Sequence, residues 1–306
     1  MFETSSGQKV AEIGNIKIGG EPSEYPFVLI GSVFYHGHKV VKDERSGEFD
    51  KEKAEKQILD FLEFSDQTGI PVIIDVVGAY KEPLFKYCKF VAEITEIPFL
   101  VDGLSDESRI YAIEKLIEMG YRDRAVYNSI DSATTVEDCH KIKDLGVNNA
   151  VLLCFGSRAV TPSQKVNLLT STDPENLGLL EKVKLAGIEN YIVDVAVLDI
   201  PSIAISAGSI KKIKEELKIP VGCAPVNALA EWQNWKMFGK TGKIGSTAAV
   251  ISYLMASGAD FGMYGSINKA DNVFPGIALL DSINAYYRKR IMKQDAEFTS
   301  FIKKLR

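Results

Sequence analysis

Short apolar runs alternate with longer amphipathic segments along almost the whole chain. Eight of these runs are rich in β-branched or aromatic residues and are apolar on both alternating faces, as strands buried beneath helices are. They cover residues 27–35, 72–78, 99–103, 125–130, 150–156, 191–197, 220–226 and 261–267. Each run therefore predicts one strand of a parallel sheet.

Helical patterns fill the intervals between these runs. Asp50 is a suitable N-cap for the first of them, and Ser105 can cap another that stops near Gly120. The remaining patterns cover residues 83–96, 135–145, 174–187, 204–217, 246–257 and 275–291. Eight strands, each followed by a helix, predict an α/β fold of the (β/α)8 TIM-barrel type. No G-x-G-x-x-G turn follows any run, which argues against a doubly wound dinucleotide-binding sheet.

The segment before the first run does not fit this repeat. Residues 10–18 alternate in polarity around Gly14-Asn15, a suitable two-residue turn, and therefore predict a β-hairpin. We expect this hairpin to close the bottom of the barrel. Because no linker, low-complexity stretch or shift of composition interrupts the chain, residues 1–306 are expected to form a single domain.

Composition narrows the classes of function. The 306 residues include 36 Lys+Arg and 41 Asp+Glu, a formal net charge of −5, which argues against a dedicated nucleic-acid-binding protein. No apolar stretch is long enough to span a bilayer and no secretory signal is visible, so we expect no transmembrane segment. The four cysteines are far apart and form no C-x-x-C pair, which is typical of a cytoplasmic protein.

Polar residues occur late in several predicted strands, where a buried strand would otherwise avoid them. They are Asp75, Asp102, Asn128, Asp194 and, closing the seventh strand, Asn227. Because side chains alternate along a strand, the first four should point the same way as the apolar residues two positions earlier. The C-terminal ends of barrel strands converge on one mouth, so these side chains are expected to meet there, with no basic residue at the same strand ends.

The chemistry of this set favours a neutral ligand with several N–H donors and an amide. Carboxylates accept hydrogen bonds from ring N–H and amino groups, and carboxamides both donate and accept, which together suit a pteridine ring. Any one of these residues alone could instead cap a loop or make a structural hydrogen bond. Five of them at one mouth favour a binding site.

Several motifs carry a family resemblance. They are YPFVLIGSVFYHGHKVVKDERSGEFDKEKAEKQI and, following it in order, IIDVVG, PFLVDG, VYNSI, VDVAVLD and GCAPVNA. On these motifs, which span nearly the whole chain, the sequence resembles the MtrH subunit of tetrahydromethanopterin S-methyltransferase and the related corrinoid-dependent methyltransferases that use tetrahydrofolate. More distantly, it resembles the pterin-binding barrels of dihydropteroate synthase and the methyltetrahydrofolate:corrinoid methyltransferases.

The resemblance implies roles for the residues at the mouth. In the pterin-binding barrels an Asp after strand three, an Asn after strand four and an Asp after strand six hold the pterin, which implies Asp102, Asn128 and Asp194 here. An Asn after strand seven that approaches N5 of the pterin corresponds to Asn227, so Asn227 and Asp194 are the implied catalytic residues. Asp75 has a weaker counterpart on strand two and is included among the pterin-binding residues. Strand eight runs into YGSINKADNVF, which lacks the basic pair expected where dihydropteroate synthase binds pyrophosphate, so that activity is not expected.

The implied activity is that of a methyltransferase that moves a methyl group between a corrinoid cobalt and N5 of a tetrahydropterin. Since the chain has no D-x-H-x-x-G signature, the cobalamin is expected on a partner corrinoid protein, and a homodimer is also expected. Two alternatives stay open: a free enzyme that uses tetrahydrofolate, and a peripheral subunit of a membrane complex that acts on tetrahydromethanopterin. The lack of an anchoring segment leads us to prefer tetrahydrofolate at this point.

Three other features of the sequence are less specific. His36 and His38 form an H-x-H pair, but the third histidine is far along the chain and no C-x-x-C accompanies them, so no metal site is expected. The segment 239–241 resembles the end of a phosphate-binding loop but lacks its first glycine and its strand. Residues 158–173 are expected to form a long loop at the mouth, where Arg158 and Lys165 beside apolar residues would dock the corrinoid protein.

Overall fold

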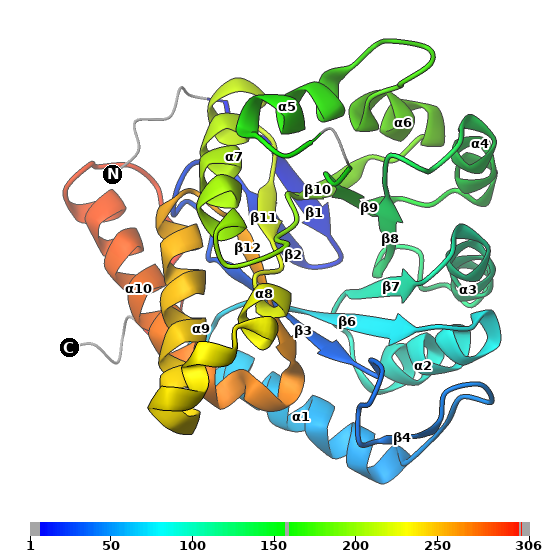
Figure 1. Ribbon diagram of the computed structural model, residues 1–306, viewed down its shortest axis with the longest axis horizontal. Coiled ribbons are helices and arrows are strands. Elements are labelled where there is room, and N and C mark those ends of the chain that lie inside the picture. Colours follow the sequence, from blue (N-terminus) through cyan, green and yellow to red (C-terminus); the bar gives the residue numbers. More distant parts are fainter. Residues whose placement is uncertain (1–6, 157–158, 300, 302–306) are drawn as a thin grey trace.

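The predicted barrel is confirmed by the computed structural model, which describes residues 7–156, 159–299 and 301. Eight parallel strands close into a barrel in chain order, and β12 pairs with β3 to complete it (Figure 1). The strands are β3 (Val28–Val33), β6 (Val72–Gly78), β7 (Phe99–Gly103), β8 (Ala125–Ile130), β9 (Asn149–Leu153), β10 (Asn190–Asp194), β11 (Val221–Cys223) and β12 (Phe261–Ser266).

A helix on the outside of the barrel follows each strand. These helices are α1 (Lys51–Thr68), α2 (Lys81–Ile94), α3 (Asp106–Glu118), α4 (Val136–Leu145), α6 (Leu179–Ala186), α7 (Ser202–Glu216), α9 (Gly239–Ala256) and α10 (Ala270–Arg290). Both predicted caps are confirmed, because the side chains of Asp50 and Ser105 accept hydrogen bonds from backbone N–H groups in the first turns of α1 and α3. Local sequence signals therefore set where these helices begin.

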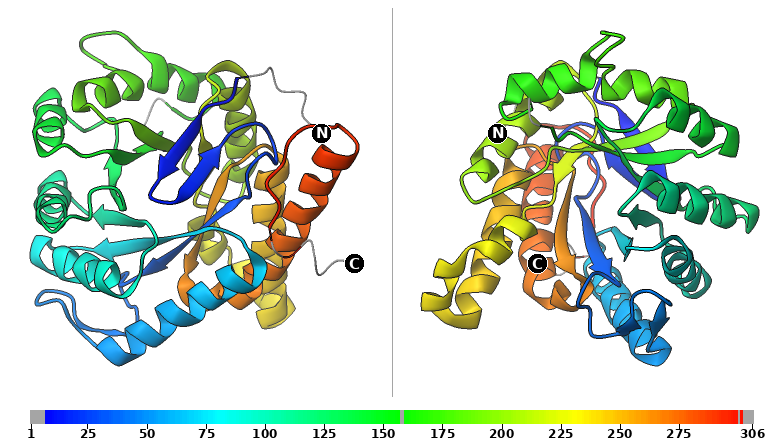
Figure 2. Two further views of the ribbon diagram at one scale, coloured as in Figure 1. Left: turned by 180° about the vertical axis from the view of Figure 1, so that it is seen from behind. Right: turned by 45° about the vertical axis from the view of Figure 1, so that its right-hand side comes forward.

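A β-hairpin closes one end of the barrel, as the sequence predicts. β1 (Val10–Ile13) and β2 (Ile16–Gly19) pair antiparallel around a turn in which Gly14 has a φ of 57°, which glycine adopts without steric cost. The backbone N–H of Gly14 donates to the carbonyl of Asp123, which precedes β8. The hairpin therefore lies across the N-terminal ends of the strands, as Figure 2 shows in its left-hand view.

Inward-pointing side chains fill the interior of the barrel. Ile73, Leu100, Val126 and Ile192, each on a different strand, are fully buried and pack in one cluster with apolar residues of the β1–β2 hairpin. The barrel is therefore a packed core and not a pore. Because side chains alternate along a strand, the residues two positions further along point into the mouth above this cluster.

The connection from β3 to α1 contains a second, unpredicted hairpin. β4 (Val41–Asp43) and β5 (Glu48–Phe49) are short and antiparallel, and they lie beside α2. Phe49 packs edge-on against Phe34 and Tyr87, whose own rings stack with centroids 4.3 Å apart. This aromatic cluster fixes the hairpin beside the mouth of the barrel.

The prediction of a long loop over residues 158–173 was wrong. Most of that segment forms α5 (Pro162–Thr170), a helix additional to the barrel repeat, which Thr161 caps and which has a proline in its first turn. Lys165 and Leu169 are buried (5 % and 0 % exposed) because α5 packs against α6 and α7. Residues 162–170 are therefore a packed helix and not a docking loop. Arg158 lies outside the described residues.

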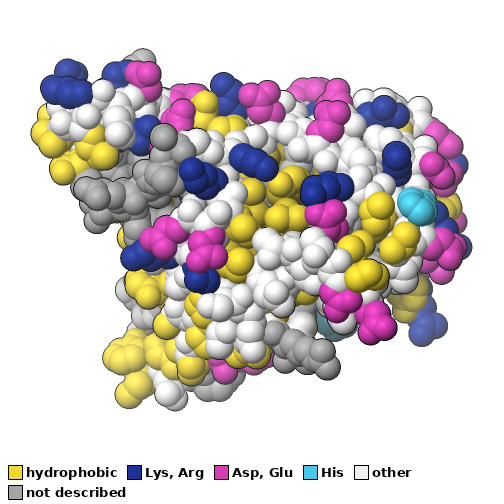
Figure 3. Space-filling model, turned by 90° about the horizontal axis from the view of Figure 1, so that it is seen from above, with side chains coloured by type: hydrophobic (Ala, Val, Ile, Leu, Met, Phe, Trp, Pro, Cys, Tyr) yellow, Lys and Arg dark blue, Asp and Glu magenta, His cyan; other side chains and the backbone are white. Residues whose placement is uncertain are grey.

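The outer surface carries both signs of charge. On the face shown in Figure 3, Lys and Arg side chains are interspersed with Asp and Glu, and apolar side chains are exposed between them. None of the helices in the described part of the chain has a segment long and apolar enough to cross a membrane.

A cavity of about 740 Å³ lies at the bottom of the barrel, at the end opposite the mouth. It is bordered by Phe27 before β3, by Asp260 before β12 and by the side of α10 that carries Asp281. Asp281 Oδ1 accepts a hydrogen bond from the backbone N–H of Phe27 (2.9 Å), while its Oδ2 has no partner among the described residues. Burial raises the pKa of Asp281 to about 7.

This buried carboxyl makes stability depend on pH. In the unfolded chain an aspartate titrates near a pKa of about 3.9, so between that value and about 7 the folded protein binds more protons than the unfolded chain. The contribution of Asp281 to the free energy of unfolding therefore falls as pH rises through this range. Asp281→Asn should flatten that fall and be more stable than the wild type at pH 8, as measured by urea denaturation from pH 5 to pH 8.

The matched control for this substitution is Asp66→Asn, at an exposed aspartate of α1. It should keep the wild-type dependence of stability on pH. A lower free energy of unfolding for Asp281→Asn than for the wild type at pH 8 would contradict the assignment.

Candidate active site

Four of the polar residues predicted at the strand ends form one layer above the apolar interior. Asp75, Asp102, Asn128 and Asp194 each lie two residues after an inward-pointing apolar residue of the same strand. Asp102 and Asn128 occupy paired positions on the adjacent strands β7 and β8. Asp75 interacts electrostatically with both Asp102 and Asp194. The structure therefore brings these four residues together at the mouth, as the alternation of side chains predicts.

The placement predicted for Asn227 was wrong in part. β11 ends at Cys223, and Pro225, which has no backbone N–H to donate, begins a turn into the short helix α8 (Val226–Glu231). Asn227 lies in the first turn of α8 and is exposed. It is therefore at the C-terminal side of the barrel but not in the buried polar layer.

Asp75 is the most deeply placed carboxyl of the layer. It lies in the middle of β6, is 5 % exposed, and its Oδ2 accepts a hydrogen bond from Ser32 Oγ at the end of β3 (2.7 Å). Burial and, to a smaller extent, the negative charge of Asp194 raise the pKa of Asp75 to about 6, although Ser32 and Asn128 act in the opposite direction. Its Oδ1 has no hydrogen-bond partner among the described residues.

Asp102 lies near the end of β7, where the charges of Asp75, Asp194 and Arg109 all act on it. Burial raises the pKa of its carboxyl well above the usual range, and the charges of Asp75 and Asp194 add to this effect. The guanidinium of Arg109, from the first turns of α3, acts in the opposite direction. Like charges and burial thus favour a protonated carboxyl at Asp102 when no ligand is bound.

Asp194 closes β10 and is 6 % exposed. One of its oxygens, Oδ1, accepts a hydrogen bond from the backbone N–H of Ala196 (2.7 Å), in a tight turn where Ala196 has a left-handed φ of 52°. Burial raises the pKa of Asp194 to about 6, and the Ala196 N–H and the ammonium of Lys165 partly offset this. The turn holds the carboxyl in a fixed orientation at the mouth.

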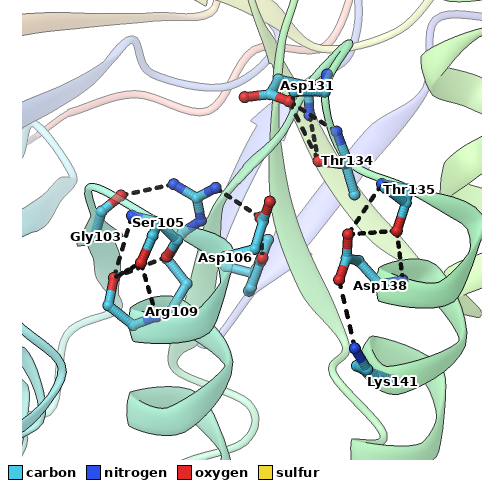
Figure 4. Close-up of polar contacts among 12 residues, drawn as sticks. Gly103, Ser105, Asp106, Arg109, Asp131, Thr134, Thr135, Asp138 and Lys141 are labelled. Carbon is cyan, nitrogen blue, oxygen red and sulfur yellow. Dashed lines mark hydrogen bonds and ion pairs between the residues drawn. The ribbon is translucent and has the colours of Figure 1, made fainter.

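The loops that follow β7 and β8 are held by polar contacts to the backbone and to helix ends (Figure 4). Arg109 donates to the carbonyl of Gly103 and to Asp106 Oδ1 (both 2.6 Å), so it ties the end of β7 to α3. Asp106 also accepts from the hydroxyl of Tyr127 on β8. In the next loop, Thr135 and Asp138 form a capping box at the start of α4. The edge of the polar layer is therefore rigidly supported.

Three residues that contact or influence the layer are not among those predicted for it from the sequence. Ser32 ends the first barrel strand, Arg109 comes from α3 and Lys165 comes from α5. The position of Ser32, two residues after inward-pointing Ile30, is a signal that the sequence does contain. Arg109 and Lys165 reach the layer from helices, and strand alternation cannot predict such contacts. The expectation that no basic residue stands at these strand ends does not extend to the two cations, because both come from helices.

The two histidines of the H-x-H pair differ in exposure and in hydrogen-bond partners. His36 is exposed and its Nδ1 is 2.8 Å from Glu44, whereas His38 is buried and its Nδ1 accepts from the backbone N–H of Phe34 (3.0 Å). Burial lowers the pKa of His38, so its neutral form is favoured. Among residues 7–156, 159–299 and 301, no group of three or more His, Cys, Asp or Glu side chains is arranged to hold a metal ion.

The layer as a whole is able to bind a ligand rich in N–H groups. Ionised carboxyls accept hydrogen bonds, protonated ones also donate one, and the amide of Asn128 does both. Since the pKa values of Asp75 and Asp194 are raised to about 6, small changes in environment alter their protonation near neutral pH. Such a layer can therefore bind a polar heterocycle and exchange protons with it.

Comparisons with known proteins identify relatives over the full length of the chain. A family model described as the tetrahydromethanopterin S-methyltransferase MtrH subunit matches residues 6–295. The same subunit of tetrahydromethanopterin S-methyltransferase from Methanothermobacter marburgensis is 34% identical, with 100% of both chains covered. The corresponding protein of Methanocaldococcus jannaschii is also 34% identical, over 95% of this chain and 96% of that one.

Solved structures share the fold at much lower sequence identity. A dihydropteroate synthase from Xanthomonas albilineans, solved with 4-aminobenzoic acid, superposes with a TM-score of 0.59 at 14% identity. The match covers 90% of this chain and 98% of that one. At this identity the likeness supports the barrel fold alone.

Proposed function

This chain belongs to the MtrH family of tetrahydromethanopterin S-methyltransferase subunits, and on that basis we propose that it moves a methyl group between N5 of a tetrahydropterin and a corrinoid cobalt. The observation that carries the proposal is the layer of Asp75, Asp102, Asn128 and Asp194 at the barrel mouth, in which Asp75 and Asp194 are buried and Asp102 and Asn128 are partly buried. Its acceptors and its amide complement the N–H and carbonyl groups of a pterin ring. Membership of a methyltransferase family supplies the reaction type.

Tetrahydromethanopterin is the pterin that we propose. The relatives are named for it, and this favours it over tetrahydrofolate, which the sequence analysis prefers. That preference depends on the lack of an anchoring segment, and a peripheral subunit of a membrane complex also needs none. Tetrahydrofolate stays the second candidate because both molecules present the same kind of pterin ring to the layer.

The corrinoid is proposed to arrive on a partner protein. Its cobalt supplies the centre that gives or accepts the methyl group when the partner is bound. Apolar side chains on the loops around the mouth fit such a partner, since Leu104, Leu198 and Phe238 are 79 %, 58 % and 62 % exposed. A homodimer, a cytoplasmic location and a single domain over residues 1–306 also stay predictions.

The side chains of the layer are proposed to bind and orient the pterin. Asp102, Asn128 and Asp194 would hold the ring by hydrogen bonds, with Asp75 beneath them, so that N5 faces the open mouth. When N5 loses its methyl group it gains a proton, and when it attacks it needs its lone pair free. The raised pKa values of the carboxyls allow the layer to hold such a proton near neutral pH.

Direct binding measurements test the choice of pterin. Calorimetric titration should show tighter binding of tetrahydromethanopterin than of tetrahydrofolate, and methyl transfer from the methylated form to reduced cobalamin should follow the same order. Tighter binding of tetrahydrofolate would reverse the choice. Binding of neither pterin would rule out the proposed function.

Substitutions in the layer test the site. Asp102→Ala, Asn128→Ala and Asp194→Ala should each weaken tetrahydropterin binding, Asp194→Ala at least tenfold, because a hydrogen bond to a charged group contributes about 1.5–3 kcal/mol. Calorimetry measures the change, with Asp66→Ala on the exposed face of α1 as the control. Wild-type affinity in all three variants would show that the pterin binds elsewhere.

Asn227 is proposed to act on the transition state more than on binding. It lies outside the buried layer and is exposed, so its amide can reach a ligand in the mouth and hydrogen-bond N5 either as donor or as acceptor. Asn227→Ala should lower the rate of methyl transfer while the pterin affinity stays within a few-fold. Equal losses of rate and affinity would make Asn227 a binding residue only.

A further inference from the structure

A buried ammonium lies behind the polar layer and belongs to none of the predicted site residues. Lys165 projects from α5 and is 5 % exposed. Its Nζ donates to the carbonyl of Cys154, just after β9 (3.0 Å), and to that of Val195, just after β10. One side chain from a helix outside the barrel repeat thus joins the ends of two neighbouring strands.

The surroundings of this ammonium are unusual for a buried charge. No carboxylate of the described residues forms an ion pair with Lys165, and its hydrogen bonds there go to neutral carbonyl oxygens. Burying a charge without an ionic partner costs free energy, and burial accordingly lowers the pKa of Lys165. An apolar side chain would fill the same space at lower cost, so packing alone does not account for a lysine here.

The nearest functional group that gains from this charge is the carboxyl of Asp194. Val195, which accepts from Lys165, directly follows Asp194, and the backbone N–H of Cys154 donates to the carbonyl of Asp194 (2.8 Å). Both backbone acceptors of the ammonium are therefore adjacent to Asp194, in the chain or across the sheet. The ammonium favours the ionised form of this carboxyl.

Asp194 also faces other titratable groups on the strands packed around it. Asp75 on β6 and Asp102 on β7 are carboxyls of the same layer, and Cys154 after β9 and Cys223 on β11 are buried thiols. Burial raises the pKa of both thiols above the usual range, so they stay neutral. Among these groups, Lys165 is the one whose charge lowers the pKa of Asp194, whereas the charge of Asp194 itself raises the pKa values of Asp75 and Asp102.

We propose that Lys165 is a positioning residue that supplies the counter-charge for Asp194, so that this carboxyl is ionised and accepts hydrogen bonds from the N–H groups of the pterin. The identity of the ligand in this proposal rests on the proposed function. The effect on Asp194 itself does not, because it is a property of the protein without ligand.

The structure provides a matched control for the loss of a buried lysine. Lys182 on α6 is also 5 % exposed, and its Nζ donates to the carbonyls of Asp131 and Ser132 (2.9 and 3.0 Å) in the loop after β8. Its electrostatic partners are Cys139, Asp131 and Asp106, and Asp194 is not among them. Lys182→Met thus removes the same kind of buried ammonium without removing the charge beside Asp194.

The first test is a pH titration of Asp194 in the free protein, in which NMR of the side-chain carboxyl carbon monitors ionisation. The variant Asp194→Asn assigns the signal. Lys165→Met should move the titration of Asp194 to higher pH, whereas Lys165→Arg, which keeps the charge, and Lys182→Met should leave it near the wild-type midpoint. Lys165→Gln keeps an amide donor without the charge and serves if Lys165→Met does not fold. An unchanged midpoint in the uncharged variants would overturn the proposal.

The second test is the pH profile of tetrahydromethanopterin binding by calorimetry. Since loss of the cation raises the pKa of Asp194, the affinity of Lys165→Met should fall several-fold more at pH 6 than at pH 8, relative to the wild type. An equal loss at both pH values would show a purely structural role and overturn the proposal. If the wild type binds no tetrahydropterin at either pH, the proposed function fails, and the NMR titration alone decides the role of Lys165.

Discussion

Closure of eight parallel strands into one barrel is the constraint on which the rest of this structure depends. Closure directs alternate side chains of every strand into an interior of fixed width, which Ile73, Leu100, Val126 and Ile192 fill together with the N-terminal hairpin. Once these apolar side chains fill the interior, the residue two positions further along each strand must point into the mouth, whatever its polarity. The backbone therefore determines how close the polar groups of the mouth lie to one another.

This closeness has an electrostatic consequence. Three carboxyls are held in a partly enclosed space, so burial and mutual repulsion both favour their protonated forms. The strands cannot supply the opposing charge, because a cation at a neighbouring inward position would occupy the space of the ligand. The two cations that oppose the shift, Arg109 and Lys165, come instead from α3 and α5, outside the ring of strands. Both are held there by hydrogen bonds to backbone carbonyls that follow the strands or end them.

Alternation and local signals in the sequence are enough to predict only part of this arrangement. The eight strands, the caps at Asp50 and Ser105, and the inward direction of the four layer residues follow from patterns of two to four residues. The connections after β3, β9 and β11 belong to no repeat, and there the prediction was incomplete or wrong. A loop is predicted over residues 158–173 although Thr161-Pro162 is a helix start, and Asn227 is assigned to a strand that in fact ends at Cys223. The start of α5 is a local signal that the barrel repeat hides, whereas the packing of α5 against α6 and α7 depends on contacts between distant segments.

The same difference between strands and connections applies to the two binding partners in the proposed reaction, the pterin and the corrinoid protein. The pterin side depends on residues whose directions the barrel imposes, so the sequence can locate them once the strands are known. The partner side depends on Leu104, Leu198 and Phe238, which lie in or beside connections of different lengths and conformations. Nothing in the repeat fixes where those side chains point, and their exposure was not predicted. A barrel can therefore keep its ligand chemistry while the surface that receives a partner changes, because the two are built from differently constrained parts of the chain.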